Sequence, residues 1–309
     1  MKRIPAPESR TSRILIDRLA IIGVGLIGGS LARALKRKRA VREVIGYGRH
    51  EANLKKAVDL RVIDSYSMNL ANVVDNADVI VVATPLTTNE RLFKGMANEI
   101  KTDAVITDVG SAKGSVVEAA RNTLGVHFRN FVPGHPIAGT EQSGVAASFA
   151  ELFEDHVVII TPTDDTRISA VEKIRQMWEL CGANVVSLPV EHHDQVLAAT
   201  SHLPHMLAYA LVDCLVNMQE RDEIFEFAAG GFRDFTRIAS SNPEMWNDVC
   251  LSNSDALLQA LDQFELYLDK IKKAIKENDG EQLLAIFHRA KKARDEYVRK
   301  RPGLDNNNE

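Results

Sequence analysis

The feature that most constrains the fold is a glycine-rich loop between an apolar strand and a helix near the start of the chain. The short strand Leu19–Ile22 leads into the sequence GVGLIG at residues 23–28, and good helix formers follow over Leu31–Lys36. A GxGxxG pattern that follows a strand and opens a helix is typical of a dinucleotide-binding βαβ unit. The pattern alone would be weak, but both flanking elements are present. We therefore expect an N-terminal Rossmann-like domain.

The glycines of this loop have separate roles in such a site. Gly23 permits the tight turn, Gly25 lets the backbone approach a pyrophosphate, and Gly28 allows the helix to pack closely on the strand. Leu26 and Ile27 stand where the helix begins, and its free N–H groups and positive dipole end favour phosphate binding. These five residues are predicted to contact the cofactor.

The residues after the second strand bear on which dinucleotide is bound. That strand is Glu43–Tyr47, and Gly48 and Arg49 follow it. An NAD site usually places Asp or Glu here to bind the ribose 2′-OH, whereas an NADP site favours Arg without a carboxylate. Arg49 offers a planar donor fork to a 2′-phosphate. We therefore favour NADP over NAD, with use of both left open. Stacking of Arg49 on the adenine is the alternative interpretation.

Further apolar strands alternate with helices along the first half of the chain. Strands are expected at residues 77–85, 104–113, 130–133, 157–162 and 185–188, with a helix at 168–181. Continuous apolar strands that alternate with helices indicate a parallel sheet covered on both faces. We expect a doubly wound α/β domain over residues 18–189.

Strand signals stop after about Pro189. Helical patterns then cover residues 191–217, 224–239, 244–276 and 280–301, and the third is interrupted near Asn253. We expect an all-α dimerisation domain over residues 190–301, a frayed tail at 1–17 and a disordered tail at 302–309. An apolar helical domain of this kind commonly buries surplus surface against a second copy.

Candidate functional residues follow several of the predicted strands. Ligands of doubly wound sheets bind at the carboxyl ends of the strands, and Thr84, Pro85, Ser111 and His135 all stand at such ends. His135 lies between glycine and proline residues in a predicted loop, where its ordinary pKa of about 6.5 suits proton transfer. A histidine that only caps the turn is the alternative.

Two clusters stand out in the helical half. His202 and His205 are three residues apart, but no cysteine or third histidine lies nearby, so we expect no metal site. Arg233 and Arg237 are four residues apart and share a helical face, where each guanidinium can bind one carboxylate of a dianionic substrate. Surface ion pairs with Asp234 are the alternative.

Composition excludes several classes of protein. The 309 residues suit two domains, and a net charge of −4 gives no indication of a nucleic-acid partner. Three widely spaced cysteines form no CxxC pair, which fits a reducing cytoplasm. The apolar run Val196–Val216 is long enough to span a bilayer, but it contains His202, Pro204, His205 and Asp213. We expect a buried helix there and no membrane association.

Five motifs occur in a specific order: GVGLIGGS at 23–30, DVGSAK at 108–113, GHPIAGTE at 134–141, SHLPH at 201–205 and GFRDFTR at 231–237. From about Leu19 to Arg301 the chain closely resembles the prephenate/arogenate (cyclohexadienyl) dehydrogenase family of tyrosine biosynthesis. The resemblance implies NAD(P)-dependent oxidative decarboxylation of prephenate to 4-hydroxyphenylpyruvate, or of arogenate, by a homodimer. Some relatives carry a regulatory domain or a fused chorismate mutase, and we expect neither here.

The resemblance also implies roles for individual residues. His135 would accept the proton of the substrate's ring hydroxyl, and Ser111 would bind that hydroxyl or orient His135. Arg237 would hold the ring carboxylate. The pocket or its entrance would be formed by His205, Arg233 and Glu141.

Two other functions stay open. A β-hydroxyacid-dehydrogenase-like oxidoreductase would normally need a lysine base on the first helix of the second domain, and no lysine occurs between Glu191 and Asn217. A non-enzymatic dinucleotide-binding protein needs only the glycine loop. It would leave Ser111, His135 and Arg237 unexplained.

Overall fold

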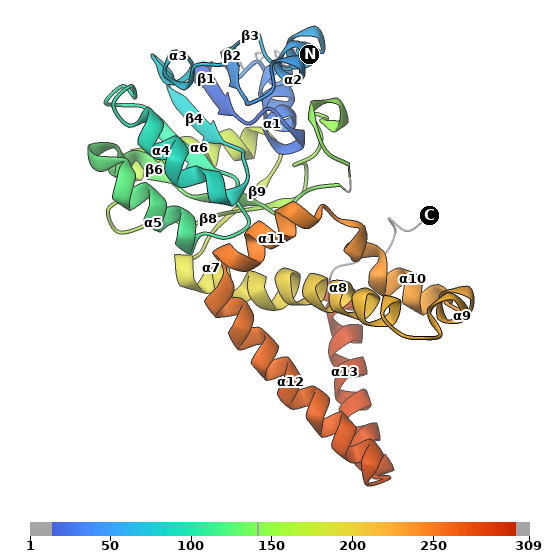
Figure 1. Cartoon of the computed structure of the whole chain (residues 1–309). Coiled ribbons are helices and arrows are strands. Elements are labelled where there is room, and N and C mark those ends of the chain that lie inside the picture. Colours follow the sequence, from blue (N-terminus) through green and yellow to red (C-terminus); the bar gives the residue numbers. More distant parts are fainter. Residues whose placement is uncertain (1–13, 141, 301–309) are drawn as a thin grey trace, which may run out of the picture. The chain divides into compact units, whose positions relative to one another are not determined.

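The computed structural model of the chain describes residues 14–140 and 142–300 (Figure 1). Residues 1–13 of the predicted tail at 1–17, the predicted tail at 302–309, and Glu141 lie outside the described residues. Two compact units divide between Leu257 and Leu258, within one long helix.

A six-stranded parallel sheet forms the centre of the first unit, with the strand order β3-β2-β1-β4-β5-β6. Its strands are β1 (Ile16–Ile22), β2 (Val41–Tyr47), β3 (Ser65–Ser67), β4 (Val79–Val82), β5 (Val105–Asp108) and β6 (Phe131–Val132). The order reverses between β1 and β4, which is the switch point where doubly wound folds bind dinucleotides. The expected fold class is confirmed. β1 begins inside the expected tail, and β3 was not predicted because it is only three residues long and contains no aliphatic side chain.

Helices cover both faces of this sheet (Figure 1). One face packs against α1 (Leu26–Arg37), α2 (Glu51–Asp59) and α6 (Ile168–Leu180). The other packs against α3 (Leu70–Val74), α4 (Asn89–Met96) and α5 (Gly114–Thr123). Successive residues of β1 serve opposite faces: Ile21 belongs to the first apolar cluster and Ile22 to the second. Each such buried side chain contributes about 1.5–3 kcal/mol to stability. Short 3₁₀ turns are η1 (Leu86–Thr88), η2 (Gly125–Asn130) and η3 (Val145–Ala147).

A second sheet corrects the prediction that the later strands extend one parallel sheet. β7 (Gly134–Pro136) pairs antiparallel with β8 (Val157–Ile160), and β8 pairs parallel with β9 (Asn184–Ser187). Pro133 separates β6 from β7 and has no N–H to donate, so the first ladder stops there. Its carbonyl instead accepts a 2.9 Å hydrogen bond from the backbone of Thr161, beside β8.

Every element from Val190 onward in the described residues is helical. The elements are α7 (Val190–Leu197), the π turn η4 (Ala198–His202), α8 (Leu203–Val216), α9 (Arg221–Glu226), α10 (Gly230–Thr236), the 3₁₀ turn η5 (Arg237–Ser240), α11 (Pro243–Ser252), α12 (Ser254–Lys276) and α13 (Gly280–Lys300). The second unit comprises most of α12 together with α13. No helix within residues 14–140 and 142–300 has the length and apolarity to cross a membrane.

Two predicted helices are interrupted. The helical stretch predicted over 191–217 is present as α7, η4 and α8, but a π turn interrupts it before Pro204, which lacks an N–H to bond the carbonyl four residues earlier. A single helix over 224–239 was wrong, since α10 begins at the poor helix formers Gly230 and Gly231. The expected break near Asn253 is confirmed.

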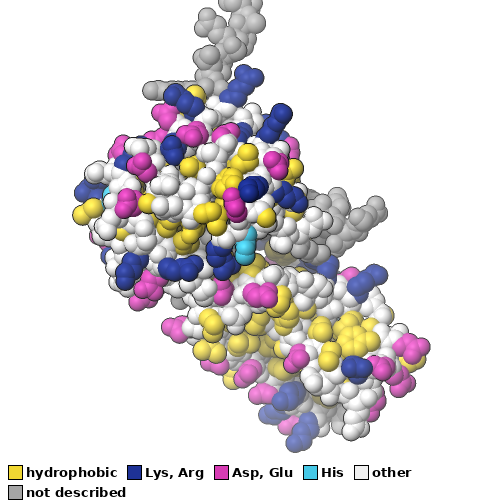
Figure 2. Space-filling view, turned by 45° about the horizontal axis from the view of Figure 1, so that its top comes forward, with side chains coloured by type: hydrophobic (Ala, Val, Ile, Leu, Met, Phe, Trp, Pro, Cys, Tyr) yellow, Lys and Arg dark blue, Asp and Glu magenta, His cyan; other side chains and the backbone are white. Residues whose placement is uncertain are grey.

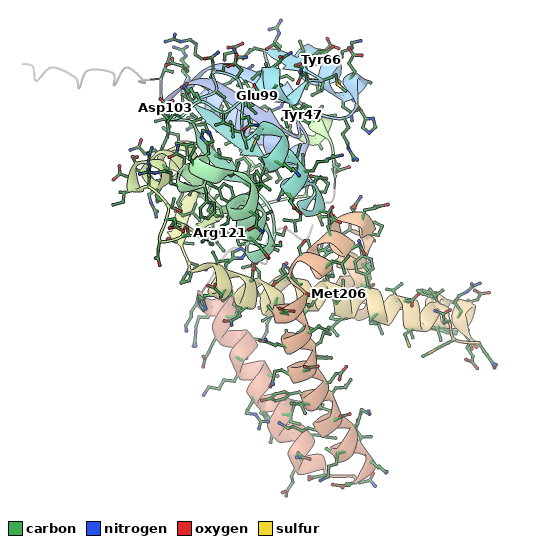
Figure 3. The ribbon with its side chains drawn as sticks, turned by 60° about the vertical axis from the view of Figure 1, so that its left-hand side comes forward. Tyr47, Tyr66, Glu99, Asp103, Arg121 and Met206 are labelled. Atoms are coloured by element: carbon green, nitrogen blue, oxygen red, sulfur yellow. The ribbon has the colours of Figure 1, made fainter. Side chains whose placement is uncertain are left out.

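Helices α8 and α11 pack against the nucleotide-binding part of the first unit. Trp246 and Val249 of α11 belong to the same apolar cluster as α4 and α5, and Met206 of α8, labelled in Figure 3, packs against it. The Thr87 hydroxyl in η1 donates a 2.9 Å hydrogen bond to Asp248 of α11. Side chains of the first helices after β9 are therefore held near the carboxyl edge of the sheet.

Candidate active site

The glycine loop has the geometry of a phosphate-binding turn. Gly23 has a φ of +97°, and a Cβ there would lie 2.3 Å from the carbonyl oxygen of Ala83. A Cβ on Gly28 would lie 2.5 Å from the carbonyl oxygen of Gly23, whereas a Cβ on Gly25 would meet nothing within 4 Å. The loop is therefore closely packed at two glycines and open at the third. The open position adjoins Leu26, where α1 begins without a side-chain cap.

This open loop fits the pyrophosphate of a dinucleotide. A phosphate beside Gly25 would meet free backbone N–H groups and the positive end of the α1 dipole. Leu26 and Ile27 form the first turn of α1, and that turn contains no acidic residue to repel the phosphate. Arg49, after β2, has an exposed side chain, and Gly48 beside it is half-buried.

Loops from three strands meet at the same edge of the sheet. A Cβ on Gly23 would lie 2.8 Å from Cγ2 of Thr84, so the loops after β1 and β4 are in contact. A Cβ on Gly110 would lie 2.4 Å from Cδ2 of Leu86, so the loop after β5 is packed against the loop after β4. Ser111 follows Gly110 and is half-buried. Among the described residues, no side chain forms a hydrogen bond with its hydroxyl.

Pro85 lies in the β4 loop and is exposed. Its carbonyl accepts a 2.7 Å hydrogen bond from the hydroxyl of Thr88, which also donates to Thr84 at 2.9 Å. These bonds fix the turn between β4 and α4 beside the glycine loop.

His135 lies at the centre of β7 and not in the predicted loop. Its register partner is Ile159 of β8, and only 9% of its surface is exposed. Nδ1 of His135 lies 2.9 Å from Nε2 of His193 on α7. Nδ1 of His193 lies 2.7 Å from Oδ1 of Asp194. His135 thus ends a chain of three side chains that begins on α7.

Asp194 also holds the start of α5. Its two carboxylate oxygens accept hydrogen bonds from the backbone N–H groups of Lys113 at 2.8 Å and of Gly114 at 2.7 Å. Burial raises the pKa of Asp194, but the hydrogen bonds from His193 and from these two amides outweigh it, and the pKa is lowered overall. Asp194 is therefore an ionised acceptor.

A buried ion pair lies directly beside His135. The Lys113 ammonium pairs with Asp108 and donates a 2.7 Å hydrogen bond to the carbonyl of Gly134. Burial lowers the pKa of His135 well below its usual value, and the charges of His193, Lys113 and His202 lower it further. His135 is consequently neutral at neutral pH.

The candidate substrate-binding residues His205, Arg237 and Arg233 lie in different surroundings. Nδ1 of His205 donates a 2.8 Å hydrogen bond to the carbonyl of Ser201, and its ring stacks on Trp246 with centroids 3.7 Å apart. The pKa of His205 is lowered by burial; the Ser201 carbonyl opposes this, and the charge of Arg237 adds to the lowering. Arg237 therefore lies within electrostatic reach of His205.

Arg233 is placed differently. Its Nε is 3.9 Å from Asp234 and its side chain is 84% exposed, which is the surface ion pair that the sequence left as an alternative. The two arginines do not share one helix, because α10 ends at Thr236 and Arg237 opens η5. Within the described residues no group of three or more His, Cys, Asp or Glu side chains is arranged to hold a metal ion.

Four side chains around His135 were not singled out from the sequence, namely His193, Asp194, Lys113 and Asp108. Asp108 and Lys113 begin and end the DVGSAK motif, so a signal was present. His193 and Asp194 lie in an ordinary amphipathic helix, and only the fold brings them to His135.

Family models match two successive segments of the chain. Residues 31–187 match the nucleotide-binding domain of prephenate dehydrogenase, and residues 189–289 match the dimerization domain of prephenate dehydrogenase. The chain belongs to the prephenate dehydrogenase family. The resemblance inferred from the ordered motifs is confirmed.

Individual members of the prephenate dehydrogenase family agree with this assignment. The chain is 41% identical to a cyclohexadienyl dehydrogenase of Zymomonas mobilis, over 91% of this chain and 96% of the relative. A crystal structure of prephenate dehydrogenase from A. aeolicus, in complex with hydroxyphenyl propionate and NAD+, superposes with a TM-score of 0.86 at 37% identity, over 91% and 98% of the chains. The structure of Synechocystis arogenate dehydrogenase gives 0.78 at 28% identity, over 91% and 100%.

Proposed function

We propose that the chain catalyses the NAD(P)-dependent oxidative decarboxylation of prephenate to 4-hydroxyphenylpyruvate, with arogenate as the alternative substrate. The observation that carries the proposal is the environment of His135. It is nine-tenths buried, burial and nearby charges hold its pKa well below the usual value, and the backbone N–H of the preceding Gly134 donates to Asp108 at the end of β5. Its Nε2 has no hydrogen-bond partner among the described residues and is free to take a proton.

The reaction needs one general base next to the hydroxyl of the substrate ring. The ring carbon that carries the substrate hydroxyl is a secondary carbinol, so it has one hydrogen to lose as hydride. When bound, the oxidised nicotinamide accepts this hydride. His135 takes the hydroxyl proton as the carbonyl forms. Loss of CO₂ from the quaternary carbon then makes the ring aromatic and leaves a phenolate oxygen, to which protonated His135 returns the proton.

We assign the remaining groups to binding. Ser111 donates to or accepts from the reacting hydroxyl, because its own hydroxyl is uncommitted and follows β5. Arg237 binds the ring carboxylate, and His205 lines the pocket with its ring held on Trp246. Arg233 and Glu141 complete the pocket or its entrance. The glycine loop, Thr84 and Pro85 hold the dinucleotide.

We further propose that NADP is preferred over NAD. Support comes from the end of β2, where Gly48 stands in place of a carboxylate and the guanidinium of Arg49 is exposed to solvent. A 2′-phosphate would meet a planar donor there and no repelling charge.

One experiment tests substrate and cofactor together. Steady-state rates are measured on one purified sample with prephenate and arogenate, each with NAD and NADP. Reduction of the cofactor with at least one substrate is expected, with the higher kcat/KM for NADP. Absence of turnover in all four assays would favour a non-enzymatic dinucleotide-binding protein, and a clear NAD preference would overturn the cofactor assignment.

A β-hydroxyacid dehydrogenase remains the second enzyme hypothesis. The helices α7 and α8 carry no lysine that could serve as its base. Lys113 does not replace it, because its ammonium is fully buried and committed to Asp108 and Gly134.

We also propose that the chain acts as a homodimer in the cytoplasm. The dimer is supported by the match to the family's dimerization domain and by exposed hydrophobic side chains, which form patches in Figure 2. Examples after Val190 are Phe227, between α9 and α10, and the helical residues Phe235, Leu266, Tyr267, Leu284 and Phe287. The cytoplasmic location is supported by Cys181, Cys214 and Cys250, which are all free thiols.

A further inference from the structure

Three side chains link the proposed base to the start of α5. Nδ1 of His135 faces Nε2 of His193 at 2.9 Å, and Nδ1 of His193 faces Asp194 at 2.7 Å. His193 is fully buried and Asp194 is 8% exposed. A buried chain of this kind has few ways to distribute its protons, because every N–H must meet an acceptor.

The carboxylate of Asp194 determines which nitrogen of His193 carries the proton. Asp194 accepts hydrogen bonds from the backbone N–H groups of Lys113 and Gly114, and these bonds favour its ionised form. An ionised carboxylate has no proton and can only accept. Nδ1 of His193 must therefore donate to it. A neutral imidazole that carries its proton on Nδ1 has a lone pair on Nε2. Nε2 of His193 then accepts, so Nδ1 of His135 donates.

We propose that His193 and Asp194 are positioning residues that hold the proton of neutral His135 on Nδ1 and leave Nε2 unprotonated for the substrate. Asp194 also stabilises the positive charge that forms when His135 takes the hydroxyl proton. No proton moves to Asp194: the substrate proton stays on Nε2 of His135 until it returns to the product oxygen. The proposal rests on the role of His135 as the base.

Several charged or titratable groups surround His135 and bear on any pH profile. From α7 these are His193 and Asp194, from the start of α5 Lys113, from the end of β5 Asp108, and from η4 His202. Lys113 and Asp108 pair with each other. Asp194 is the negative group at the far end of the chain.

The direct test reads the tautomer without measuring turnover. The full chain, with its nine histidines labelled with ¹⁵N, is studied by long-range proton–nitrogen NMR at neutral pH. The His135 and His193 signals are assigned from the spectra of the His135→Asn and His193→Gln variants. We expect the His135 proton on Nδ1. A proton on Nε2, as a doubly protonated His193 would enforce, overturns the proposal.

The kinetic test uses two adjacent histidines of α7. His193→Phe keeps a ring of similar size but removes both hydrogen bonds, so kcat should fall between about tenfold and 10⁴-fold, as when a triad base adopts the wrong tautomer. The KM for the dinucleotide should not change. His193→Gln should recover part of the loss, because its amide oxygen can accept from Nδ1 of His135. The matched control is His192→Phe, at an exposed histidine one residue away, and it should keep the parent kcat.

The pH profile separates positioning from stability. Loss of folded protein lowers activity equally at every pH, whereas a changed environment of His135 moves the acidic limb of kcat/KM. An unchanged kcat and an unchanged limb in folded His193→Phe would overturn the proposal. If His193→Phe fails to fold, His193→Gln and the NMR spectrum of the parent chain decide.

Two variants distinguish the role of His135 as the base from the positioning roles of His193 and Asp194. Near-normal turnover in His135→Asn removes His135 as the base and with it the proposed mechanism. An inactive His135→Asn beside a fully active His193→Phe removes only the roles of His193 and Asp194.

Discussion

At the scale of single residues, the environment of His135 decides what it can do. Its ring is buried beside His193 and Lys113, and burial together with the charges of these two residues opposes a positive charge on the ring. A base that must start neutral gains from this, since the pKa of His135 lies well below its ordinary value. The sequence singled out His135 but did not predict its surroundings, because β7 is only three residues long and its partners are distant in the chain.

The first prediction concerns this residue. His135→Asn should bind the dinucleotide as the parent does and lose at least about 10²-fold in kcat, the usual contribution of a positioned base. In the parent enzyme the acidic limb of kcat/KM should lie below pH 6.5, because His135 must be neutral and its pKa is lowered. Stopped assays across pH and a fluorescence titration of the dinucleotide measure both effects. Turnover close to the parent value would remove His135 from the role.

At the scale of elements, the loop between β1 and α1 combines two different requirements. Gly23 and Gly28 face their own sheet and helix at distances that exclude a Cβ, whereas Gly25 faces open space. Gly23 and Gly28 serve packing, and the proposed role of Gly25 is to leave room for the ligand. The GxGxxG pattern predicted this loop well because the pattern is a local property of one turn and its flanking elements.

Two substitutions distinguish these requirements. Gly25→Ala should leave the thermal unfolding midpoint nearly unchanged and weaken dinucleotide binding by at least about tenfold, since its methyl group would enter the space for the pyrophosphate. Gly23→Ala should instead destabilise the fold by at least about 1–3 kcal/mol, because its φ is positive and its Cβ meets a carbonyl oxygen. Calorimetry and titration on both variants make the comparison. Equal effects of the two changes on stability would contradict the assignment.

The helical elements were harder to predict. The change from strands to helices near residue 189 was visible in the apolar pattern, and the family models also change there. The π turn at Ala198–His202 and the breaks around Gly230 were missed, although Pro204 and the glycines were noted. Periodicity over a long window averages across such short interruptions, whereas they determine where His205 and Arg237 stand.

At the scale of the whole molecule, exposed apolar side chains support the proposed dimer. Phe227 is 73% exposed on the link between α9 and α10, and on α13 Leu284 and Phe287 are each more than half exposed. Such side chains are costly to leave in water when they form a contiguous patch. Second copies of the same chain are the commonest solution.

The corresponding prediction is a stable dimer. Light scattering at micromolar concentration should give twice the chain mass of 34.2 kDa. Phe287→Glu would replace a half-exposed aromatic side chain of α13 by a charge and should shift the equilibrium towards the monomer. A charge at Leu180, an exposed leucine at the end of α6, is the control and should not. A parent chain that elutes and scatters as a monomer would refute the dimer.

The π turn before α8 sets the angular phase of everything that follows it on that helix. A π turn holds an extra residue compared with a regular α-helix, in which each residue advances the side-chain direction by about 100°. If residues 198–202 lost one position and became regular, His205 would rotate by about that angle and leave its stack on Trp246. The π turn between α7 and α8 therefore fixes the direction of His205 relative to that of His193, whose ring contacts His135.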